Sequence, residues 1–202
     1  MESDGYIVDT QTGILSFRRA TQETTNPKPT VFLDRDGVLN RHIADGYVTR
    51  WDEFVMLPGV PTALRQLLNT GFRLVIVSNQ AGVAKGFLSC DDLIHITSMS
   101  LRKLGKDGAE VDGAFFCLHQ AVDDCPCRKP KPGLLRRAAH FFPTDFSRSF
   151  LIGDSRNDVL AGAAMACRTI HLAARPDASV PATHQASNLT EAVRWIISQS
   201  VG

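Results

Sequence analysis

From residue 30 onward, short apolar runs alternate with longer segments whose apolar residues follow helical spacing. The apolar runs have the length and composition of buried strands and are Thr30–Asp34, Arg73–Asn79, Gly113–Leu118, Ser149–Asp154 and Arg168–Ala173. The helical segments are Val60–Thr70, Asp91–Leu104, Leu134–Phe141, Asp158–Ala166 and Leu189–Ser200. This alternation predicts an α/β fold in which a Rossmann-like parallel sheet carries helices on both faces.

Polar side chains follow three of the predicted strands at the point where each strand ends. Asp34 closes the first, Ser78 and Asn79 close the second, and Asp154 closes the fourth. Because the carboxyl ends of parallel strands meet at one edge of a sheet, ligands of such folds bind there. We therefore expect these four residues to share one rim.

The first 29 residues differ from the rest of the chain. Gln22–Pro29 is polar and interrupted by prolines, which indicates a linker, and Tyr6–Phe17 could form a small hairpin around Gly13 or a disordered tail. A chain of 202 residues has room for one well-buried domain. We assign residues 1–29 to an N-terminal extension and 30–202 to a single domain, and expect a chain without residues 1–27 to fold and work.

Composition excludes some classes of function. A formal net charge of +1 gives no overall attraction to nucleic acid or to an acidic membrane surface. No apolar run reaches the roughly 18 residues that a membrane-spanning helix needs, and residues 1–30 lack the apolar core of a secretory signal. We expect a cytoplasmic monomer with a small-molecule substrate and no nucleic-acid partner.

The first motif is Asp34-Arg35-Asp36-Gly37-Val38, directly after a buried strand. Two carboxylates so placed can share the work on one phosphate: the first attacks phosphorus, and the second protonates the leaving oxygen and then activates water. A D-x-D pair alone is more often a solvated loop, but the preceding strand and the following Gly-Val-Leu make the catalytic interpretation stronger.

Three further motifs fit the same chemistry. Ser78 with the amides that follow it could hold phosphoryl oxygens, although a helix cap or turn is the simpler interpretation. Lys129, set between Arg128 and Pro130, could neutralise phosphate charge, although such loops are usually solvated. Asp154 could bind Mg²⁺ with support from Asp158, although a helix N-terminus also favours acidic residues.

In this order, the four motifs resemble those of the haloacid dehalogenase superfamily, over roughly residues 30–174. The resemblance implies that Asp34 is the nucleophile and Asp36 the general acid/base, with Ser78 and Lys129 holding the phosphoryl group. It also implies a Mg²⁺ ion bound by the Asp34 carboxylate, the Asp36 carbonyl and the Asp154 carboxylate. The competing class is a non-enzymatic, zinc-stabilised binding module, which would be expected to have lost at least one of these residues.

A fifth motif places Cys117, His119, Cys125 and Cys127 within eleven residues. Three thiolates and one imidazole suit a tetrahedral structural Zn²⁺. Free cysteines are the alternative, and a disulfide between Cys125 and Cys127 would form a strained ring.

The loop with these cysteines resembles two sister groups, the heptose 1,7-bisphosphate 7-phosphatases and the histidinol-phosphate phosphatases. The five-residue gap after His119 is more like the histidinol-phosphate group, whereas the stretches 34–40, 46–48 and 78–86 look like the heptose group. We favour the heptose group because those stretches flank the catalytic strands; a polynucleotide 3′-phosphatase ranks lower. Too few residues separate Asp36 from Pro58 for a cap domain, so we expect a capless, open site. The expected substrate-binding residues are Arg35, Asp45, Gly46, Tyr47, Asn79, Gln80 and Arg128.

Overall fold

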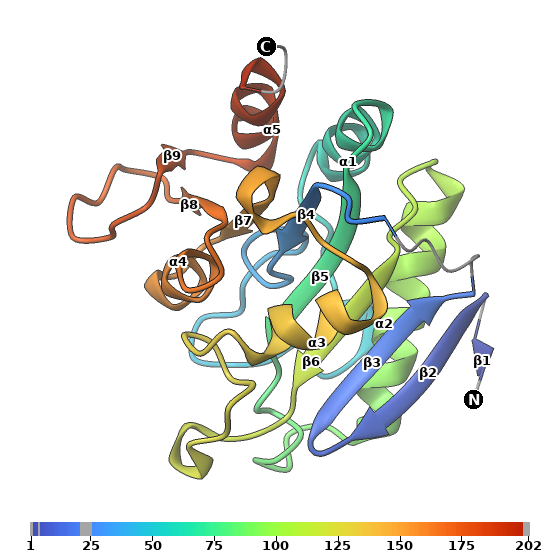
Figure 1. Ribbon diagram of the computed structural model, residues 1–202. Helices are drawn as coiled ribbons and strands as arrows, with labels where there is room; N and C mark the ends of the chain where they lie inside the picture. The colour runs from blue at the N-terminus through green and yellow to red at the C-terminus, as the bar shows by residue number, and fades with distance from the viewer. Residues whose placement is uncertain (1, 4, 21–25, 200–202) are drawn as a thin grey trace.

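The computed structural model describes residues 2–3, 5–20 and 26–199, and its centre is one mixed β-sheet (Figure 1). Within these residues the strands lie in the order β1-β2-β3-β6-β5-β4-β7-β8-β9. Neighbours from β6 to β9 along this order run parallel, and β1, β2 and β3 extend the sheet in antiparallel fashion beside β6. The strands are β1 (Glu2–Ser3), β2 (Tyr6–Gln11), β3 (Ile14–Arg19), β4 (Thr30–Leu33), β5 (Arg73–Asn79), β6 (Gly113–Cys117), β7 (Phe150–Gly153), β8 (Arg168–Leu172) and β9 (His184–Ala186).

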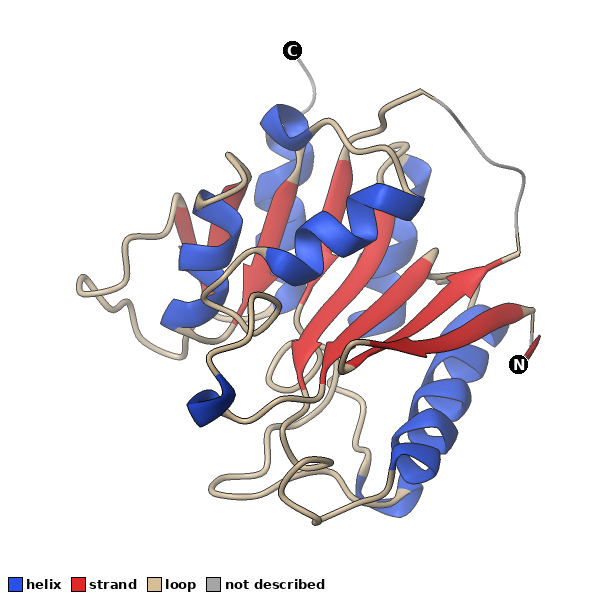
Figure 2. Ribbon diagram, turned by 60° about the horizontal axis from the view of Figure 1, so that its bottom comes forward, coloured by secondary structure: helices blue, strands red, loops and turns tan. Residues whose placement is uncertain are grey.

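Helices cover both faces of the sheet, as predicted (Figure 2). Alternate residues of each central strand point to opposite faces: Leu33 belongs to one apolar cluster with residues of α1, α2 and α5, and Phe32 to the other with residues of α3 and α4. The helices are α1 (Val60–Asn69), α2 (Cys90–Lys106), α3 (Gly133–Phe141), α4 (Arg156–Ala163) and α5 (Leu189–Ser198). Short 3₁₀ helices occupy Trp51–Glu53, Ala121–Asp123 and Phe146–Arg148. In the described part of the chain, no helix has the length and apolar character needed to cross a membrane.

The N-terminal segment forms a hairpin, so the alternative of a disordered tail is wrong for residues 6–19. Thr12 and Gly13 both adopt positive φ, of 49° and 72°, as a tight two-residue hairpin turn requires. β3 then pairs with β6, and the side chains of Leu15 and Phe17 are fully buried in the same core as α1 and α2. These contacts argue against the expectation that residues 1–27 are dispensable.

The remaining differences between the predicted and observed elements concern one short strand and the ends of segments. β9 was not predicted, since three residues with a polar start carry little strand signal. Part of the expected linker, residues 21–25, and the end of the last predicted helix, residue 200, lie outside the described residues. Between β4 and α1 the chain forms only loops and the Trp51–Glu53 turn, in keeping with a capless site.

Candidate active site and metal centre

The predicted rim residues meet at the carboxyl ends of β4, β5 and β7. Asp34 is the first residue after β4, and its amide donates to the Ile152 carbonyl of the neighbouring strand β7 at 2.9 Å. Asp154 follows β7 directly, and Ser78 lies at the end of β5. Asp34, Asp154 and Asp158 each offer a carboxylate oxygen within 4.8 Å of the others.

Lys129 lies inside this acidic cluster and is buried. Its ammonium donates to Asp34 Oδ1 at 2.9 Å, to the Val77 carbonyl at 2.8 Å and to Asp158 Oδ1. Burial lowers the pKa of Lys129, but the charges of Asp158 and Asp34 outweigh it and raise that pKa overall. Lys129 therefore stays cationic beside the expected nucleophile.

Asn79 holds the backbone that carries Lys129. Its amide nitrogen donates to the Lys129 carbonyl, and the Lys129 amide donates to Asn79 Oδ1, both at 3.0 Å. A side-chain amide that pairs with both backbone groups of one residue fixes the position of that residue. Asn79 was predicted only as a substrate ligand, and the structure shows that it also positions Lys129.

Asp158 both caps a helix and takes part in the site. Ser155 is the N-cap of α4: its hydroxyl accepts a bond from the Asp158 amide, and its own amide donates to Asp158 Oδ2 at 3.2 Å. The other oxygen of Asp158 receives the Lys129 ammonium. Asp158 therefore caps α4 and pairs with Lys129 at the same time. Both interpretations given for this residue from the sequence, a helix cap and a support of the site, hold together.

The cluster has more negative than positive charge. Burial, followed by the charge of Asp158, raises the pKa of Asp34 from 3.8 to about 7, although Lys129 and the Ser78 hydroxyl act to lower it. Burial and Asp158 also raise the pKa of Asp154. The single ammonium of Lys129 therefore compensates the charges of Asp34 and Asp154 only in part. Their oxygen atoms are hard donors, which suit a divalent cation such as Mg²⁺.

Gly37 lets the nucleophile loop approach this cluster. Its φ is 81°, and a Cβ atom at this position would lie 2.0 Å from Asp154 Oδ2. A side chain at residue 37 would therefore displace the carboxylate that is expected to bind the metal.

Asp36 is held by three neighbours rather than being free in the cavity. Its carboxylate accepts bonds from Arg35 Nη2 at 2.9 Å, Asn40 Nδ2 at 2.8 Å and Gln80 Nε2 at 2.8 Å. Burial raises the pKa of Asp36, but the charge of Arg35 and the bonds from Asn40 and Gln80 outweigh it and lower that pKa overall.

This network includes two residues that were predicted to bind the substrate. Arg35 is 2% exposed and Gln80 is 1% exposed, and both side chains bond Asp36. Their side chains support the carboxylate of Asp36, the expected general acid/base, and do not line the cavity described below. Asn40, fully buried, was missed; a polar residue four positions after Asp36 in an otherwise apolar stretch was the available signal.

The cavity above these groups has a volume of about 180 Å³ and brings most of the predicted residues together. Its lining also includes His42, which sequence analysis missed and whose Nδ1 lies 3.7 Å from Asp154 Oδ2. Asp45 and Arg128 are not part of its lining. The residues that line it are Asp34, Asp36, His42, Ile43, Gly46, Tyr47, Val48, Ser78, Asn79, Lys129, Asp154 and Ser155.

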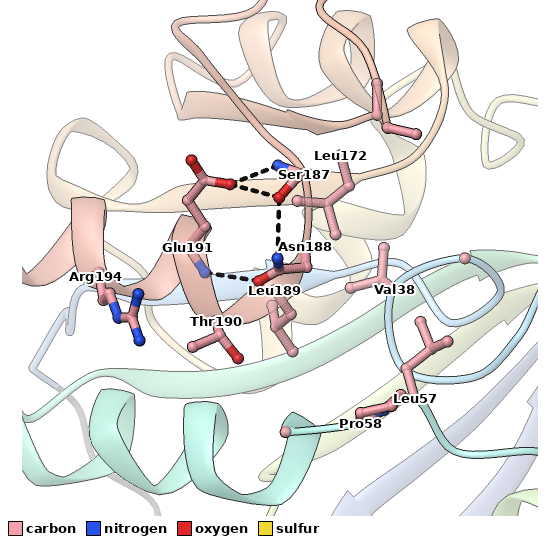
Figure 3. A pocket seen from close by; sticks show the side chains of 14 residues that line it. Val38, Leu57, Pro58, Leu172, Ser187, Asn188, Leu189, Thr190, Glu191 and Arg194 are labelled. Atoms are coloured by element: carbon pink, nitrogen blue, oxygen red, sulfur yellow. Dashed lines mark hydrogen bonds between the residues drawn. The ribbon is translucent and has the colours of Figure 1, made fainter.

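A larger cavity, of about 790 Å³, lies beside the same rim between the start of α5 and the Gly37–Val38 loop (Figure 3). Its polar groups already serve the helix: Glu191 accepts bonds from the amide and hydroxyl of Ser187, and the Glu191 amide donates to Asn188 Oδ1. The three clustered carboxylates and Lys129 are absent from its lining. The smaller cavity is therefore the one equipped for phosphate chemistry.

The four predicted zinc ligands also meet. The sulfur atoms of Cys117, Cys125 and Cys127 lie 3.3–3.6 Å apart, and His119 Nδ1 lies 3.6 Å from Cys117 Sγ and 3.3 Å from Cys127 Sγ. A tetrahedral metal with bonds of about 2.3 Å to sulfur separates its ligands by about 3.8 Å. All three cysteines are free thiols rather than disulfide partners, so the arrangement fits a four-coordinate metal ion.

Comparison with known proteins agrees with this geometry. A family model described as haloacid dehalogenase-like hydrolase matches residues 6–166. The chain is 41% identical over 141 residues to D-glycero-beta-D-manno-heptose-1,7-bisphosphate 7-phosphatase of Pasteurella multocida, covering 67% of this chain and 76% of the relative. It is 35% identical over 175 residues to the protein of the same name from Helicobacter pylori strain J99, covering 86% and 98%.

Among solved structures, the chain resembles the D,D-heptose 1,7-bisphosphate phosphatase of B. bronchiseptica complexed with magnesium and phosphate, with a TM-score of 0.76 and 29% identity over 85% of this chain and 99% of that one. It also resembles a putative phosphatase of the same superfamily from Mesorhizobium loti, with a TM-score of 0.81 and 25% identity over 95% and 96%. Sequence, fold and site agree: the chain belongs to the haloacid dehalogenase-like hydrolases.

Proposed function

We propose that this chain is a Mg²⁺-dependent phosphatase that removes the 7-phosphate of D-glycero-β-D-manno-heptose 1,7-bisphosphate through a phosphorylated Asp34. The observation that carries the proposal is the contact of the buried Lys129 ammonium with Asp34 in a cavity that Asp36, Ser78 and Asp154 also line. The names of the relatives at 35% and 41% identity support the choice of substrate.

The reaction follows from the groups that line the cavity. A carboxylate oxygen of Asp34 attacks phosphorus while the bond from phosphorus to the sugar oxygen breaks, and Asp36 gives that oxygen a proton. Because Arg35, Asn40 and Gln80 lower the pKa of Asp36 in the free protein, this step requires Asp36 to take up a proton once the substrate is bound. Water then attacks phosphorus, Asp36 takes a proton from that water, and the bond from Asp34 to phosphorus breaks to release phosphate. Lys129 and Ser78 would stabilise the charge on the phosphoryl oxygens during both steps.

Mg²⁺ held by Asp34 and Asp154 would compensate the clustered negative charge and draw electron density from the phosphoryl oxygens. The chain's own contribution is to hold the groups ready. Asn79 fixes Lys129, while Asn40 and Gln80 fix the carboxylate of Asp36. Groups oriented before the substrate arrives lower the barrier because little reorganisation is left to the reaction.

The small cavity suits the phosphoryl group being cleaved, so the rest of the sugar would lie outside it. Tyr47 lines the cavity and packs against Phe87, with the rings tilted by 31° and their centroids 5.4 Å apart. Lys85 Nζ lies 5.6 Å from the centroid of the Tyr47 ring. Arg128, next to Lys129 in the chain, would bind the distal phosphate. Asp45 stays a predicted contact of the sugar.

We also propose that Cys117, His119, Cys125 and Cys127 bind one structural Zn²⁺, since three thiolates and one imidazole are preferred ligands of that ion. Its loop leads directly into Arg128 and Lys129, so the ion would shape the substrate side of the rim. We also propose that the protein is a cytoplasmic monomer without nucleic-acid partners.

The test is a panel of phosphate esters offered to the protein with Mg²⁺: heptose 1,7-bisphosphate, histidinol phosphate and a 3′-phosphorylated oligonucleotide. A charge-assisted contact to a second phosphate contributes about 1.5–3 kcal/mol, or about 10- to 150-fold in kcat/KM. We expect heptose bisphosphate to exceed histidinol phosphate by about that factor, with the 1-phosphate left in the product. Faster turnover of histidinol phosphate or of the oligonucleotide would contradict the proposal.

A further inference from the structure

The turn of the N-terminal hairpin lies beside the candidate zinc site formed by Cys117, His119, Cys125 and Cys127. β3 runs antiparallel to β6 (Figure 1), and the register places Ile14 opposite Cys117, the first of the expected metal ligands. One residue before Ile14, the Gly13 carbonyl accepts a bond from the Leu118 amide at 2.9 Å. The sheet thereby carries the hairpin turn to the start of the metal-binding loop.

Gly13 leaves room for the imidazole of His119. Its φ is 72°, and a Cβ atom there would lie 2.2 Å from His119 Cε1 and 2.4 Å from Nε2. Real Cβ atoms do not approach other heavy atoms so closely, so any side chain at residue 13 would have to push the ring or the turn away.

The imidazole of His119 that lies beside Gly13 also lies beside the thiols of the candidate metal site. His119 Nδ1 faces the sulfur atoms of Cys117 and Cys127, and the Cβ position at Gly13 lies nearest Cε1 and Nε2 and 3.0 Å from Nδ1. The imidazole is thus enclosed between the turn and the thiols. Contacts behind a metal ligand fix its orientation, and their loss typically costs about 10- to 100-fold in metal affinity.

We propose that the hairpin turn Thr12–Gly13 is a positioning element of the metal centre, which holds the His119 ring on the metal and slows metal loss. This inference rests on the metal centre of the proposed function, but not on the identity of the substrate. It gives the N-terminal hairpin a role beyond extending the sheet.

The test compares Gly13→Ala with Gly5→Ala in the full chain. Gly5 has a similar φ of 82°, but a Cβ atom there would have nothing within 4 Å, so the control introduces the same backbone strain without the contact. Each protein is loaded with Zn²⁺, and the rate of zinc release to a chromogenic chelator is measured. Gly13→Ala should release zinc about 10- to 100-fold faster than the wild type, the usual effect of losing an orienting contact, and Gly5→Ala should match the wild type.

A second background separates this contact from general damage to the fold. His119→Cys keeps four ligands for zinc and removes the ring, so Gly13→Ala should have no further effect on zinc release there. If Gly13→Ala alone fails to fold, the double variant should fold and hold zinc. Equal rates of zinc release from Gly13→Ala and Gly5→Ala would overturn this inference but not the proposed function. An unfolded double variant of Gly13→Ala and His119→Cys would have the same meaning. A wild-type protein that binds no zinc would overturn the metal centre as well.

Discussion

Asp34→Asn should abolish turnover and, without divalent cations, stabilise the protein at pH 8. Asp34 is buried, and its pKa is raised from 3.8 to about 7, chiefly by that burial. A carboxyl group whose pKa is higher in the folded state favours folding fully below its unfolded pKa, and this contribution is lost as the pH rises through the folded value. The wild type should therefore lose stability between about pH 4 and pH 8, a loss that an uncharged side chain avoids.

The size of the effect follows from the pKa shift. A rise from 3.8 to about 7 is about 3 pKa units, each of which corresponds to about 1.4 kcal/mol. Asn resembles the protonated carboxyl group in shape and charge, so the gain at pH 8 is at most about 4 kcal/mol. For a chain of this length that corresponds to a rise in Tm of up to about 8–16 °C.

Thermal unfolding in the presence of EDTA at pH 5 and pH 8 measures this difference. Asp34→Asn should melt well above the wild type at pH 8 and less far above it at pH 5, where the pKa shift costs the wild type only about 1.7 kcal/mol. Added Mg²⁺ should stabilise the wild type more than the variant. Asp52→Asn, at a side chain 72% exposed, is the control and should melt like the wild type at both pH values. If Asp34→Asn were less stable than the wild type at pH 8, the charge balance described for the site would be wrong.

Four further changes test other parts of the account. Lys129→Met leaves the Asp158 and Asp34 carboxylates buried without their cation, so it should cost about 3–5 kcal/mol in denaturant unfolding and about 10²–10³ in kcat; wild-type stability would refute the pairing. Cys125→Ser should lower both the zinc content by elemental analysis and the Tm. Phe17→Ala should cost about 3–5 kcal/mol, because it empties a fully buried position in the hairpin; a small loss would restore the expectation that the N-terminal segment is dispensable. Arg128→Ala should raise KM for heptose bisphosphate about tenfold with little change in kcat. An equal fall in kcat and kcat/KM, with KM unchanged, would instead place Arg128 in the chemical step.

Sequence pattern predicted β4, β5 and β7 well because each is a short apolar run that ends at, or just before, a polar residue. β5 occupies the predicted Arg73–Asn79, and β4 ends one residue before Asp34. The same pattern could not place the hairpin in the sheet. Its pairing with β6 joins residues about a hundred positions apart, and nothing local in Tyr6–Phe17 specifies that partner.

For the site, residue type predicted which groups gather but not which neighbour each one contacts. Asp34 and Lys129 were expected to act together, and they do touch. Arg35 and Gln80 were expected to reach the substrate, yet both turn inward to Asp36. A polar residue beside a catalytic motif can face the ligand or support the carboxylate, and backbone direction after the strand decides between them.

The central claim is that Asp34 carries the phosphoryl group, and chemical trapping of the phosphorylated enzyme tests it most directly. Asp36→Asn should hydrolyse the intermediate slowly, so this variant is mixed with heptose bisphosphate and Mg²⁺, quenched and treated with borohydride, which reduces an acyl phosphate to an alcohol. Peptide mapping by mass spectrometry should then find homoserine at position 34 only in the sample that received substrate. Unmodified Asp34, or reduction at another carboxylate, would contradict the account.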